Sequence, residues 1–547
     1  MNKLLFIAKK NYAEIILTIL ALLFSFWLMF HTFSYKEGQM LIASKAWSDF
    51  SSQIPLIRSF SFGLNFPPQY PLFAREPIHY HFLFYAFVGM LERANIPLDY
   101  ALNIPSALGF SLLIVLIYTF ANNLFHSKTT ALLSILFFLF NGTLSFIYFF
   151  SKHPLSLNTP SEIISNAKFP SFGPYDAGLV SAFWNLNIYT NQRHLAASYA
   201  FAVLILLIFL FILPKLNNKR KSIAVIALGV SLGLFFYFHL AILLAATVSL
   251  FLLAIINKRL KEGLTIFVIA GIICFPQYLY LSHGSLAYSV KFHPGYLVAN
   301  NLTFVSFFLH WIANLGLHIV LIPLGVFFSD KKQRFVFLAV LSIFIIGNLF
   351  QFSPEIAGNH KFINYFMLFG VMFTAYAILK LWTKEILPKP IIVSIVFFLI
   401  FSGIIDFFPV YNDKKGAILD YQRDPTVRWI IKNTKPDAVF LNSSYLYTPE
   451  SLAGRKIMMG WPYFAWSAGY DVESRGKFIE QVFSLSEKKT ACKFLSSQNI
   501  DYIRITNPPD PSFPKINQDL LAKFKRIYND TNTQTVIYDV KENCRDT

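Results

Sequence analysis

The chain has 547 residues, of which 55% are hydrophobic and only 14% charged, and its formal net charge is +18. Ordinary soluble domains carry about 25% charged residues, so this composition excludes a soluble globular protein. Apolar runs of about 20 residues recur along the chain and predict a polytopic α-helical membrane protein. In such a protein, excess Lys and Arg reflects cytoplasmic loops and anionic lipid, and we expect no nucleic-acid partner.

The first apolar run, residues 14–30, follows three lysines and lacks a small-residue cleavage site, so we interpret it as a retained anchor. The lysines predict a cytoplasmic N-terminus and place the next segment, residues 33–102, outside the membrane as a long first outer loop. Within that loop, residues 82–91 are apolar but too few to cross a bilayer. We expect them to form a helix that lies in, or re-enters, the outer leaflet.

Ten further spans follow, which makes about eleven transmembrane helices. They are predicted near residues 103–124, 131–150, 194–213, 222–237, 239–256, 264–281, 303–327, 335–352, 362–381 and 391–409. With this count every short basic loop lies on one side, as the positive-inside rule requires. The low cysteine count, three in all, favours a prokaryotic plasma (inner) membrane.

The composition changes after the last span. Of the 29 acidic residues, 16 follow Val410. Strand-like runs are expected at 438–441, 456–459, 502–506 and 535–540, and helical runs at 427–432, 476–484, 490–498 and 518–526. We therefore divide the chain into a transmembrane domain, 1–410, and an extracytoplasmic α/β domain, 411–547. Cys492 and Cys544 could pair in an extracytoplasmic tail.

Only 13 acids precede the tail, so the choice of a catalytic carboxylate in the membrane part is short. Asp49 lies early in the first outer loop, between Trp47 and Phe50. An acid held among aromatic residues at the interface could act as a general base or hold a divalent cation. A solvated loop acid or a helix cap is the plain alternative. Asp176 and Glu355, on later outer loops, are the candidate second acids.

Basic residues gather where the outer loops enter the spans. The second outer loop ends in Arg193 and His194, and the short fourth outer loop ends in His360 and Lys361. Arg193 suits bidentate hydrogen bonding to a lipid phosphate, and the other three could bind a phosphate headgroup at the surface. Snorkelling to headgroups and an ordinary polar hairpin remain open.

Two further stretches could contact a substrate. Arg75, Glu76, His79 and His81 lie close together in the first outer loop and could hydrogen-bond a phosphate or a sugar, or anchor the loop at the interface. In the tail, Trp461 belongs to an aromatic stretch with nearby arginines. Sugar C–H faces pack on such rings, although the same residues would also dock the tail onto the rest of the protein.

Taken together, these residues resemble the GT-C superfamily of integral-membrane glycosyltransferases, which includes protein O-mannosyltransferases and aminoarabinose transferases. The likeness rests on the early acid in Trp47-Ser48-Asp49, on the stretch Pro77-Ile78-His79-Tyr80-His81, and on Asn103-Ile104-Pro105-Ser106-Ala107-Leu108-Gly109 at the next span. It covers about residues 1–210. The chain departs from the family in two places: Asn103 stands where the family has Arg, and Asp49 lacks a paired acid.

The resemblance implies inverting transfer of a sugar from a polyprenyl-phosphate carrier to an acceptor on the extracytoplasmic face. The partners it implies are the lipid-linked donor, membrane lipid and a glycan, lipid or protein acceptor. Asp49 would be the general base or a metal ligand, and the implied cofactor is a divalent cation such as Mg²⁺ or Mn²⁺.

Three alternatives stay open. A glycan polymerase or ligase that uses a lipid diphosphate would rely on Arg and His and would not need Asp49. A lipid or solute transporter would show charges in mid-membrane, broken helices and inverted repeats. A membrane scaffold with a binding tail would need none of these groups.

Overall fold

The computed structural model describes residues 12–171, 179–281, 289–298, 301–506 and 510–545. By its internal contacts the chain divides into two compact units. The membrane unit comprises Met1–Thr32, Asn103–Phe275 and Val290–Lys414. The loop–tail unit comprises Phe33–Leu102, Pro276–Ser289 and Lys415–Thr547. The first outer loop thus groups with the tail, and the division at residue 411 stays a prediction.

Within the described residues, eight helices are long and apolar enough to cross a membrane. They are α2 (Tyr12–Thr32), α5 (Leu98–Phe125), α11 with its extension (Leu195–Lys215), α12 (Asn218–Phe238), α14 (Leu260–Leu281), α17 (Lys331–Leu349), α18 with the turn before it (Ile356–Thr383) and α19 (Lys389–Tyr411). Two shorter apolar helices, α6 (Lys128–Leu139) and α13 (Leu240–Ile256), and the bent pair α15 (Phe304–Leu315) and α16 (His318–Phe327) match the remaining predicted spans. The predicted polytopic α-helical fold is confirmed.

Two of the predicted spans are broken rather than continuous. The span expected at 131–150 stops at the end of α6 and resumes as α7 (Ser145–Lys152), while α15 and α16 meet at 89°. Gly316 turns the second break with a φ of +52°, and a Cβ there would lie 1.9 Å from the carbonyl oxygen of Gly142. The two breaks therefore touch, and only glycine permits so close an approach.

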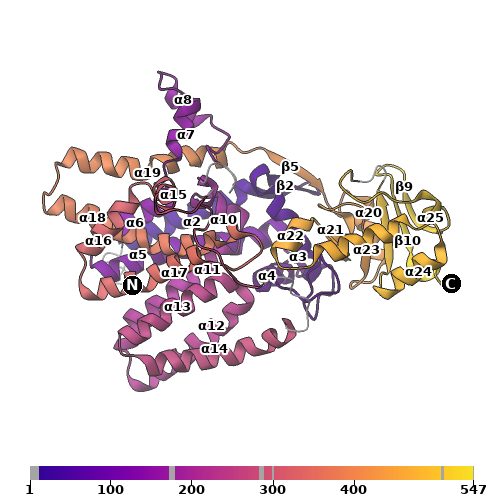
Figure 1. Cartoon of the computed structure of the whole chain (residues 1–547), viewed down its shortest axis with the longest axis horizontal. Helices are drawn as coiled ribbons and strands as arrows, with labels where there is room; N and C mark the ends of the chain where they lie inside the picture. The colour runs from indigo at the N-terminus through magenta and orange to yellow at the C-terminus, as the bar shows by residue number, and fades with distance from the viewer. Residues whose placement is uncertain (1–11, 172–178, 282–288, 299–300, 507–509, 546–547) are drawn as a thin grey trace, which may run out of the picture. The chain divides into compact units, whose positions relative to one another are not determined.

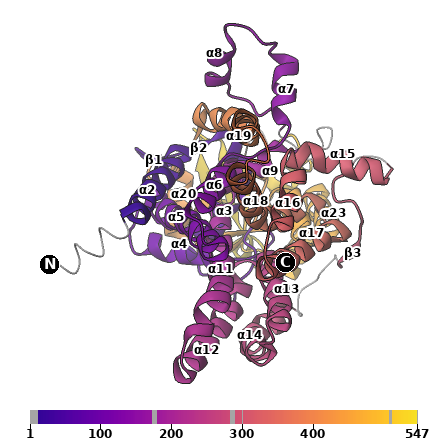
Figure 2. The ribbon, with the colours of Figure 1, turned by 90° about the vertical axis from the view of Figure 1, so that its left-hand side faces the viewer.

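Helix packing in the membrane unit relies on glycines and large apolar side chains. Gly325 of α16 lies against the backbone of Phe373 in α18, so these two helices approach closely, as Figure 2 shows. Gly229 and Gly233 of α12 likewise face Ile269 and Ile273 of α14, which lies beside α12 in Figure 1. Small residues at helix contacts are the usual means of close packing in a membrane.

The loop–tail unit begins with a sheet that joins distant parts of the chain. β1 (Phe33–Lys36) and β2 (Gln39–Ala43) form an antiparallel hairpin, and β5 (Lys415–Leu419) pairs antiparallel with β2. Helices α3 (Trp47–Ser61) and α4 (Leu83–Arg93) complete this part. The helix expected at 82–91 is therefore present.

The tail forms the predicted α/β arrangement around a five-stranded mixed sheet of order β7-β6-β8-β10-β9. The strands are β6 (Val439–Leu441), β7 (Lys456–Ile457), β8 (Tyr502–Thr506), β9 (Arg526–Asp530) and β10 (Thr535–Asp539). Its helices include α20 (Pro425–Asn433), α21 (Pro449–Leu452), α22 (Pro462–Ser467), α23 (Val472–Ser484), α24 (Lys488–Ser497), α25 (Gln518–Ala522) and α26 (Val540–Asn543). Cys492 and Cys544 form a disulfide. The helix expected to reach residue 526 ends at Ala522 and β9 follows, because Arg526–Asp530 pairs with β10.

Candidate functional site

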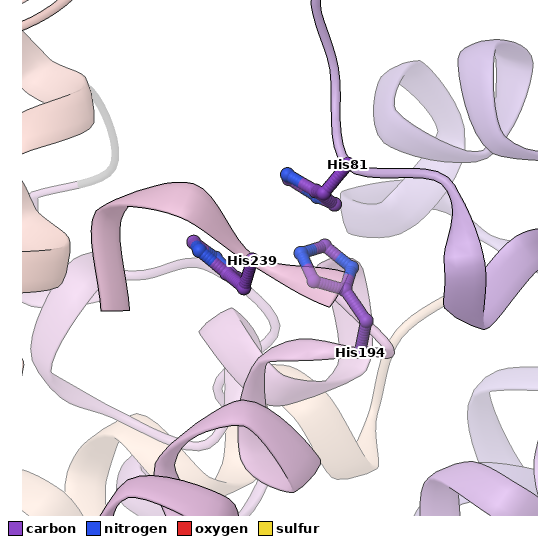
Figure 3. Close-up of side chains that lie close together, drawn as sticks. All are labelled: His81, His194 and His239. Atoms are coloured by element: carbon purple, nitrogen blue, oxygen red, sulfur yellow. The ribbon is translucent and has the colours of Figure 1, made fainter. Parts of the chain in front are cut away.

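Two buried histidines lie side by side in the membrane unit. His194 immediately precedes α11, and His239 forms the extended break between α12 and α13. Figure 3 shows the two rings beside each other. Their centroids are 5.2 Å apart, and at most 1% of either residue is exposed. The Nδ1 atom of His239 accepts a hydrogen bond from the Ile242 N–H at 3.4 Å, so its side chain caps α13. This bond directs Nε2 away from the helix.

His360 and Lys361 begin α18 and add to the same group of basic side chains. The His360 ring is buried, with Nε2 3.4 Å from the Gln192 amide nitrogen and Nδ1 3.3 Å from that of Asn364. The half-buried Lys361 accepts a hydrogen bond at its carbonyl oxygen from the Tyr199 hydroxyl, at 2.9 Å. His194, His239, His360 and Lys361 are called the basic cluster below.

The electrostatics of the basic cluster favour an anion. Burial lowers the pKa of His194, and the Lys361 charge lowers it further. Burial also lowers the pKa of His239 well below its usual value, and His194, Lys361 and His360 act in the same direction. These imidazoles are therefore neutral at neutral pH. A bound anion would oppose the repulsion between the basic groups and favour the protonated forms.

A pocket that is partly open to solvent lies next to the basic cluster within the membrane unit. Its polar wall consists of side chains from Asn141, Thr143, Asn314, His318 and Asn364. The rest is largely apolar and aromatic: Phe137, Phe138, Phe183, Trp184, Ile188, Tyr189, Leu315, Met367, Leu368 and Val371.

Asn364 and Phe183 connect this pocket to the basic cluster. The Asn364 amide donates to the Phe183 carbonyl oxygen at 3.1 Å and also lies beside His360. The Phe183 ring lies 4.6 Å from the His360 ring. Basic groups and an apolar cavity thus share two wall residues, which is an arrangement suited to a ligand with an anionic head and an apolar body.

Arg193, predicted to bind a donor phosphate, is fully buried in the membrane unit. Its guanidinium donates to Asn103 Oδ1 at 3.2 Å, to Thr32 Oγ1 at 2.8 Å and to the Met29 carbonyl oxygen at 3.3 Å. These bonds tie the start of α11 to α2 and α5. Asn103, which replaces the arginine of the resembled family, is therefore a partner of Arg193. A phosphate-binding role for Arg193 stays a prediction.

Asp49 lies in the first turn of α3, where the helix dipole stabilises a negative charge. The neighbouring Trp47 ring lies so close to Gly416 of β5 that a Cβ there would be 2.3 Å away, and it also packs on Tyr447 at 4.8 Å. The Tyr447 hydroxyl donates to the Trp47 carbonyl oxygen at 2.6 Å. Burial, with the Asp49 charge added, raises the pKa of Tyr447. A phenol therefore lies near a half-buried carboxylate.

A metal at Asp49 finds little support in the surrounding residues. Within the described parts of the chain, no group of three potential metal ligands includes Asp49. Mg²⁺ is bound by one or two carboxylates together with waters and phosphates of the substrate. A metal at Asp49 would therefore need ligands from the substrate, and this role stays a prediction.

His79 and His81 lie in the loop–tail unit in different surroundings. The His79 ring stacks on Tyr470 at 4.5 Å, its backbone N–H donates to the Tyr470 hydroxyl at 2.8 Å, and that hydroxyl donates to the Pro77 carbonyl at 2.6 Å. His81 contacts the Tyr80 ring, with centroids 3.6 Å apart. Burial lowers the pKa of His79, partly opposed by Glu76. His79 thus docks the first outer loop onto the tail.

Arg75 also joins these two segments, because its guanidinium donates to the Asn499 carbonyl oxygen at 2.5 Å. Glu76 is half-buried, and its carbonyl oxygen accepts from the Tyr70 N–H at 3.4 Å. Trp461 precedes α22 and packs edge-on against Tyr445 at 5.6 Å with 38% of its surface exposed. Substrate contacts by these residues stay predictions.

Of the two candidate second acids, the structure describes Glu355 but not Asp176. Glu355 caps a short helical turn, since its carboxylate accepts from the Ala357 N–H at 3.0 Å. Asp176 lies outside the described residues. His239 is a site residue that the sequence does not single out, because it falls at the start of the apolar run 239–256. One feature of the sequence could have indicated it: a histidine lies between two apolar runs. A polar side chain there is costly in a membrane unless it has a hydrogen-bonding partner or a ligand.

No protein-family model matches the sequence, and no curated protein is similar to it at a significant level. Several solved structures are similar in fold. An oligosaccharyltransferase from Archaeoglobus fulgidus, in complex with Zn and sulfate, has 13% identity and a TM-score of 0.48 over 90% of this chain and 68% of that chain. ArnT from Cupriavidus metallidurans, in the apo state, has 11% identity and a TM-score of 0.48 over 97% and 98% of the two chains.

The same two proteins have also been solved with lipid phosphates. The Archaeoglobus enzyme was solved with an inhibitory peptide and a dolichol-phosphate, at 13% identity and a TM-score of 0.42 over 91% of this chain and 70% of that chain. ArnT was solved bound to undecaprenyl phosphate, at 11% identity and a TM-score of 0.46 over 97% and 98% of the two chains. At these identities and TM-scores, the likeness says nothing about the substrate, mechanism or site residues of this chain.

Proposed function

We propose that this protein is a membrane glycosyltransferase that takes a sugar from a polyprenyl-phosphate donor and passes it to an acceptor on the extracytoplasmic face. The observation that carries the proposal is the basic cluster. Its three histidines are buried at the ends of membrane helices, and the cluster contacts two wall residues of a largely apolar pocket. A ligand with a phosphate head and an isoprenoid chain matches both parts.

The basic cluster would bind the phosphate of the donor. Lys361 supplies a permanent charge, and His194, His239 and His360 are hydrogen-bond donors that gain charge when an anion approaches. Their burial strengthens each interaction with the phosphate relative to water. As the bond to the sugar breaks, negative charge accumulates on the phosphate, so the same groups would stabilise the leaving group.

Asp49 would be the general base. It would accept the proton of an acceptor hydroxyl while that oxygen forms a bond to the anomeric carbon. The bond between the anomeric carbon and the phosphate oxygen breaks, and the polyprenyl phosphate leaves with that electron pair. Attack opposite to the leaving group inverts the anomeric centre. The position of Asp49 at the start of α3, fixed by Trp47 packing, supports a base held in a defined orientation.

A plasma-membrane location with an extracytoplasmic tail completes the proposal. The short basic loops gather on one side of the predicted spans, which supports a cytoplasmic N-terminus. The Cys492–Cys544 disulfide in the tail supports an oxidising compartment for that segment.

The same basic cluster also supports an alternative function, that of a polymerase or ligase that uses a lipid diphosphate. Three imidazoles and one ammonium group suffice for a second phosphate, and this reaction would need no base at Asp49. The two hypotheses therefore differ in whether the lipid monophosphate or the lipid diphosphate binds more tightly.

The affinities of the purified protein in nanodiscs for undecaprenyl phosphate and for undecaprenyl diphosphate would distinguish the two hypotheses. We expect tighter binding of the monophosphate, weakened roughly ten- to hundredfold by Lys361→Met because a charged hydrogen bond is lost. Lys384→Met is the matched control, since Lys384 lies exposed beyond the other end of α18. Equal losses in both variants, or a clear preference for the diphosphate, would contradict the proposal.

A further inference from the structure

A single acid is buried inside the last membrane helix, and the proposed reaction does not use it. Asp406 lies in α19, five residues before the helix ends at Tyr411, and only 1% of its surface is exposed. Its Oδ2 atom accepts hydrogen bonds from the side-chain amides of Asn141, at 3.1 Å, and Asn185, at 3.2 Å. An ionisable residue within a membrane span marks a functional site by default.

The two amides are oriented by the backbone. Asn141 Oδ1 accepts from the Thr143 N–H at 3.2 Å, and Asn185 Oδ1 accepts from the Asn187 N–H at 2.9 Å. Because each amide oxygen is occupied by a donor, each amide nitrogen must be the atom that faces Asp406. Two fixed N–H donors on one oxygen suit an ionised carboxylate, and equally the carbonyl oxygen of a neutralised acid.

The other carboxylate oxygen, Oδ1, is buried and accepts no hydrogen bond. In the part of the chain that the structure describes, no basic side chain forms an ion pair with Asp406. A buried carboxylate with one unsatisfied oxygen and no counter-charge is costly. The arrangement is therefore complete only with a positive charge at Oδ1.

The acid lies where a broken helix is fastened to α19. The segment between α6 and α7 is bound by the Gly403 N–H, which donates to the Asn141 carbonyl oxygen at 3.1 Å, and by the Ser402 hydroxyl, which donates to the Thr143 carbonyl at 2.5 Å. A Cβ on Gly403 would lie 2.4 Å from the Phe140 Cα. Unwound segments of broken membrane helices are where transport proteins bind coupling cations.

We propose that Asp406 forms a binding site for a small monovalent cation, a proton or Na⁺, between the α6–α7 break and α19. The occupied site neutralises the acid and holds Asn141 in place. Because Asn141, Gly142 and Thr143 also line the pocket, occupancy sets the shape of that wall. The inference stands on the geometry around Asp406 and does not depend on the proposed glycosyl transfer.

Asp406→Asn tests the site without disturbing the fold. The new amide can place its oxygen where Oδ2 accepts the two bonds and its nitrogen where Oδ1 lies, so the variant imitates the neutralised acid. Thermal unfolding of the full chain in nanodiscs would be followed while NaCl replaces choline chloride at constant ionic strength. In a separate series the buffer would change from mildly alkaline to about pH 6.5, above the range in which protonation of the buried histidines destabilises the fold. Asp330→Asn, an exposed helix cap, is the control of equal charge change.

We expect the melting temperature of the wild type to rise by several degrees in one of the two series, because a ligand that binds only the folded state stabilises it. A rise with Na⁺ identifies a sodium site. A rise with acid alone, together with an infrared band of a protonated carboxyl that Asp406→Asn abolishes, identifies a proton site. In either case Asp406→Asn should melt at the elevated temperature throughout, and Asp330→Asn should follow the wild type. Identical Na⁺ and pH responses in wild type and Asp406→Asn would overturn the proposal.

Discussion

The guanidinium of Arg58 and the carboxylate of Asp420 lie 2.6 Å apart, with both side chains completely buried, although 362 positions separate them in the sequence. Glu92 of α4 lies 3.1 Å from the same guanidinium nitrogen and accepts a hydrogen bond from Ser61 at 2.6 Å. Burial opposes the charge on Arg58, but Glu92 and Asp420 outweigh it and raise the pKa of Arg58. This group fastens the first outer loop to the segment that follows β5.

Arg58→Met should destabilise the loop–tail unit by about 3–5 kcal/mol, because it leaves two buried carboxylates without a counter-charge. Chemical unfolding followed by tryptophan fluorescence would measure the loss. Arg423→Met is the control, since Arg423 and Glu37 form an exposed pair at 3.3 Å, whose loss should cost under about 1 kcal/mol. A small effect of Arg58→Met would show that the buried pair does not hold the loop to the tail.

Asp49→Asn should lower kcat of glycosyl transfer by roughly 10²–10⁴-fold, the usual contribution of a general base, and leave the melting temperature within a degree or two. Glu37→Gln removes an exposed acid from the same loop and should retain full activity. If Asp49→Asn kept its activity, the general base would be another residue, and the protein would still be a glycosyltransferase.

The buried histidines predict a loss of stability in acid. The pKa of His194 and of His239 is lowered in the folded state, so the unfolded chain, with a pKa of about 6.5 at each, takes up protons first as the pH falls. Stability is therefore fully present above about pH 6.5 and falls below it, by up to about 1.4 kcal/mol per pH unit for each group. His239→Asn, which keeps a capping side chain, should flatten this dependence.

Unfolding at a series of pH values would measure the slope. His153→Asn, a change at an exposed histidine, should leave the slope as it is in the wild type. An unchanged slope in His239→Asn would mean that the imidazole is not held neutral by burial.

Removal of the tail disulfide should destabilise the tail. Cys492 and Cys544 are 52 positions apart, and closing a loop of that length restricts the unfolded chain by about 4 kcal/mol in the entropic model. Cys544→Ser should therefore lower the unfolding midpoint, while Cys274→Ser, at a cysteine outside the disulfide, should not. Equal midpoints for wild type and Cys544→Ser would show that the bond does not form in the mature protein.

Hydropathy located the membrane helices well, because a bilayer demands long apolar helices wherever the chain crosses it. It could not find the breaks at Gly142 and Gly316, since their cause is a contact between two glycines 174 positions apart in the sequence. The strand pairing of β2 with β5 and the pair of Arg58 with Asp420 are hidden for the same reason.

The basic cluster was partly predictable. His194, His360 and Lys361 stood out as polar groups at the ends of spans, and the structure brings them together with His239. His239 lies at the junction of two apolar runs, where hydropathy alone indicates only a short connection between spans. Asp406 is a single acid in an apolar helix, and nothing in the sequence around it indicates the two amides that face it.

We infer above all that the protein consumes a polyprenyl-phosphate sugar. The most direct test is to incubate the purified protein in lipid with a panel of radiolabelled polyprenyl-phosphate sugars and to follow the release of polyprenyl phosphate. We predict turnover with at least one donor. Asp49→Asn should lower kcat by roughly 10²–10⁴-fold, Lys361→Met should raise KM, and Lys384→Met should leave the kinetics unchanged. Absence of turnover with every monophosphate donor, together with consumption of a diphosphate-linked glycan, would contradict the account.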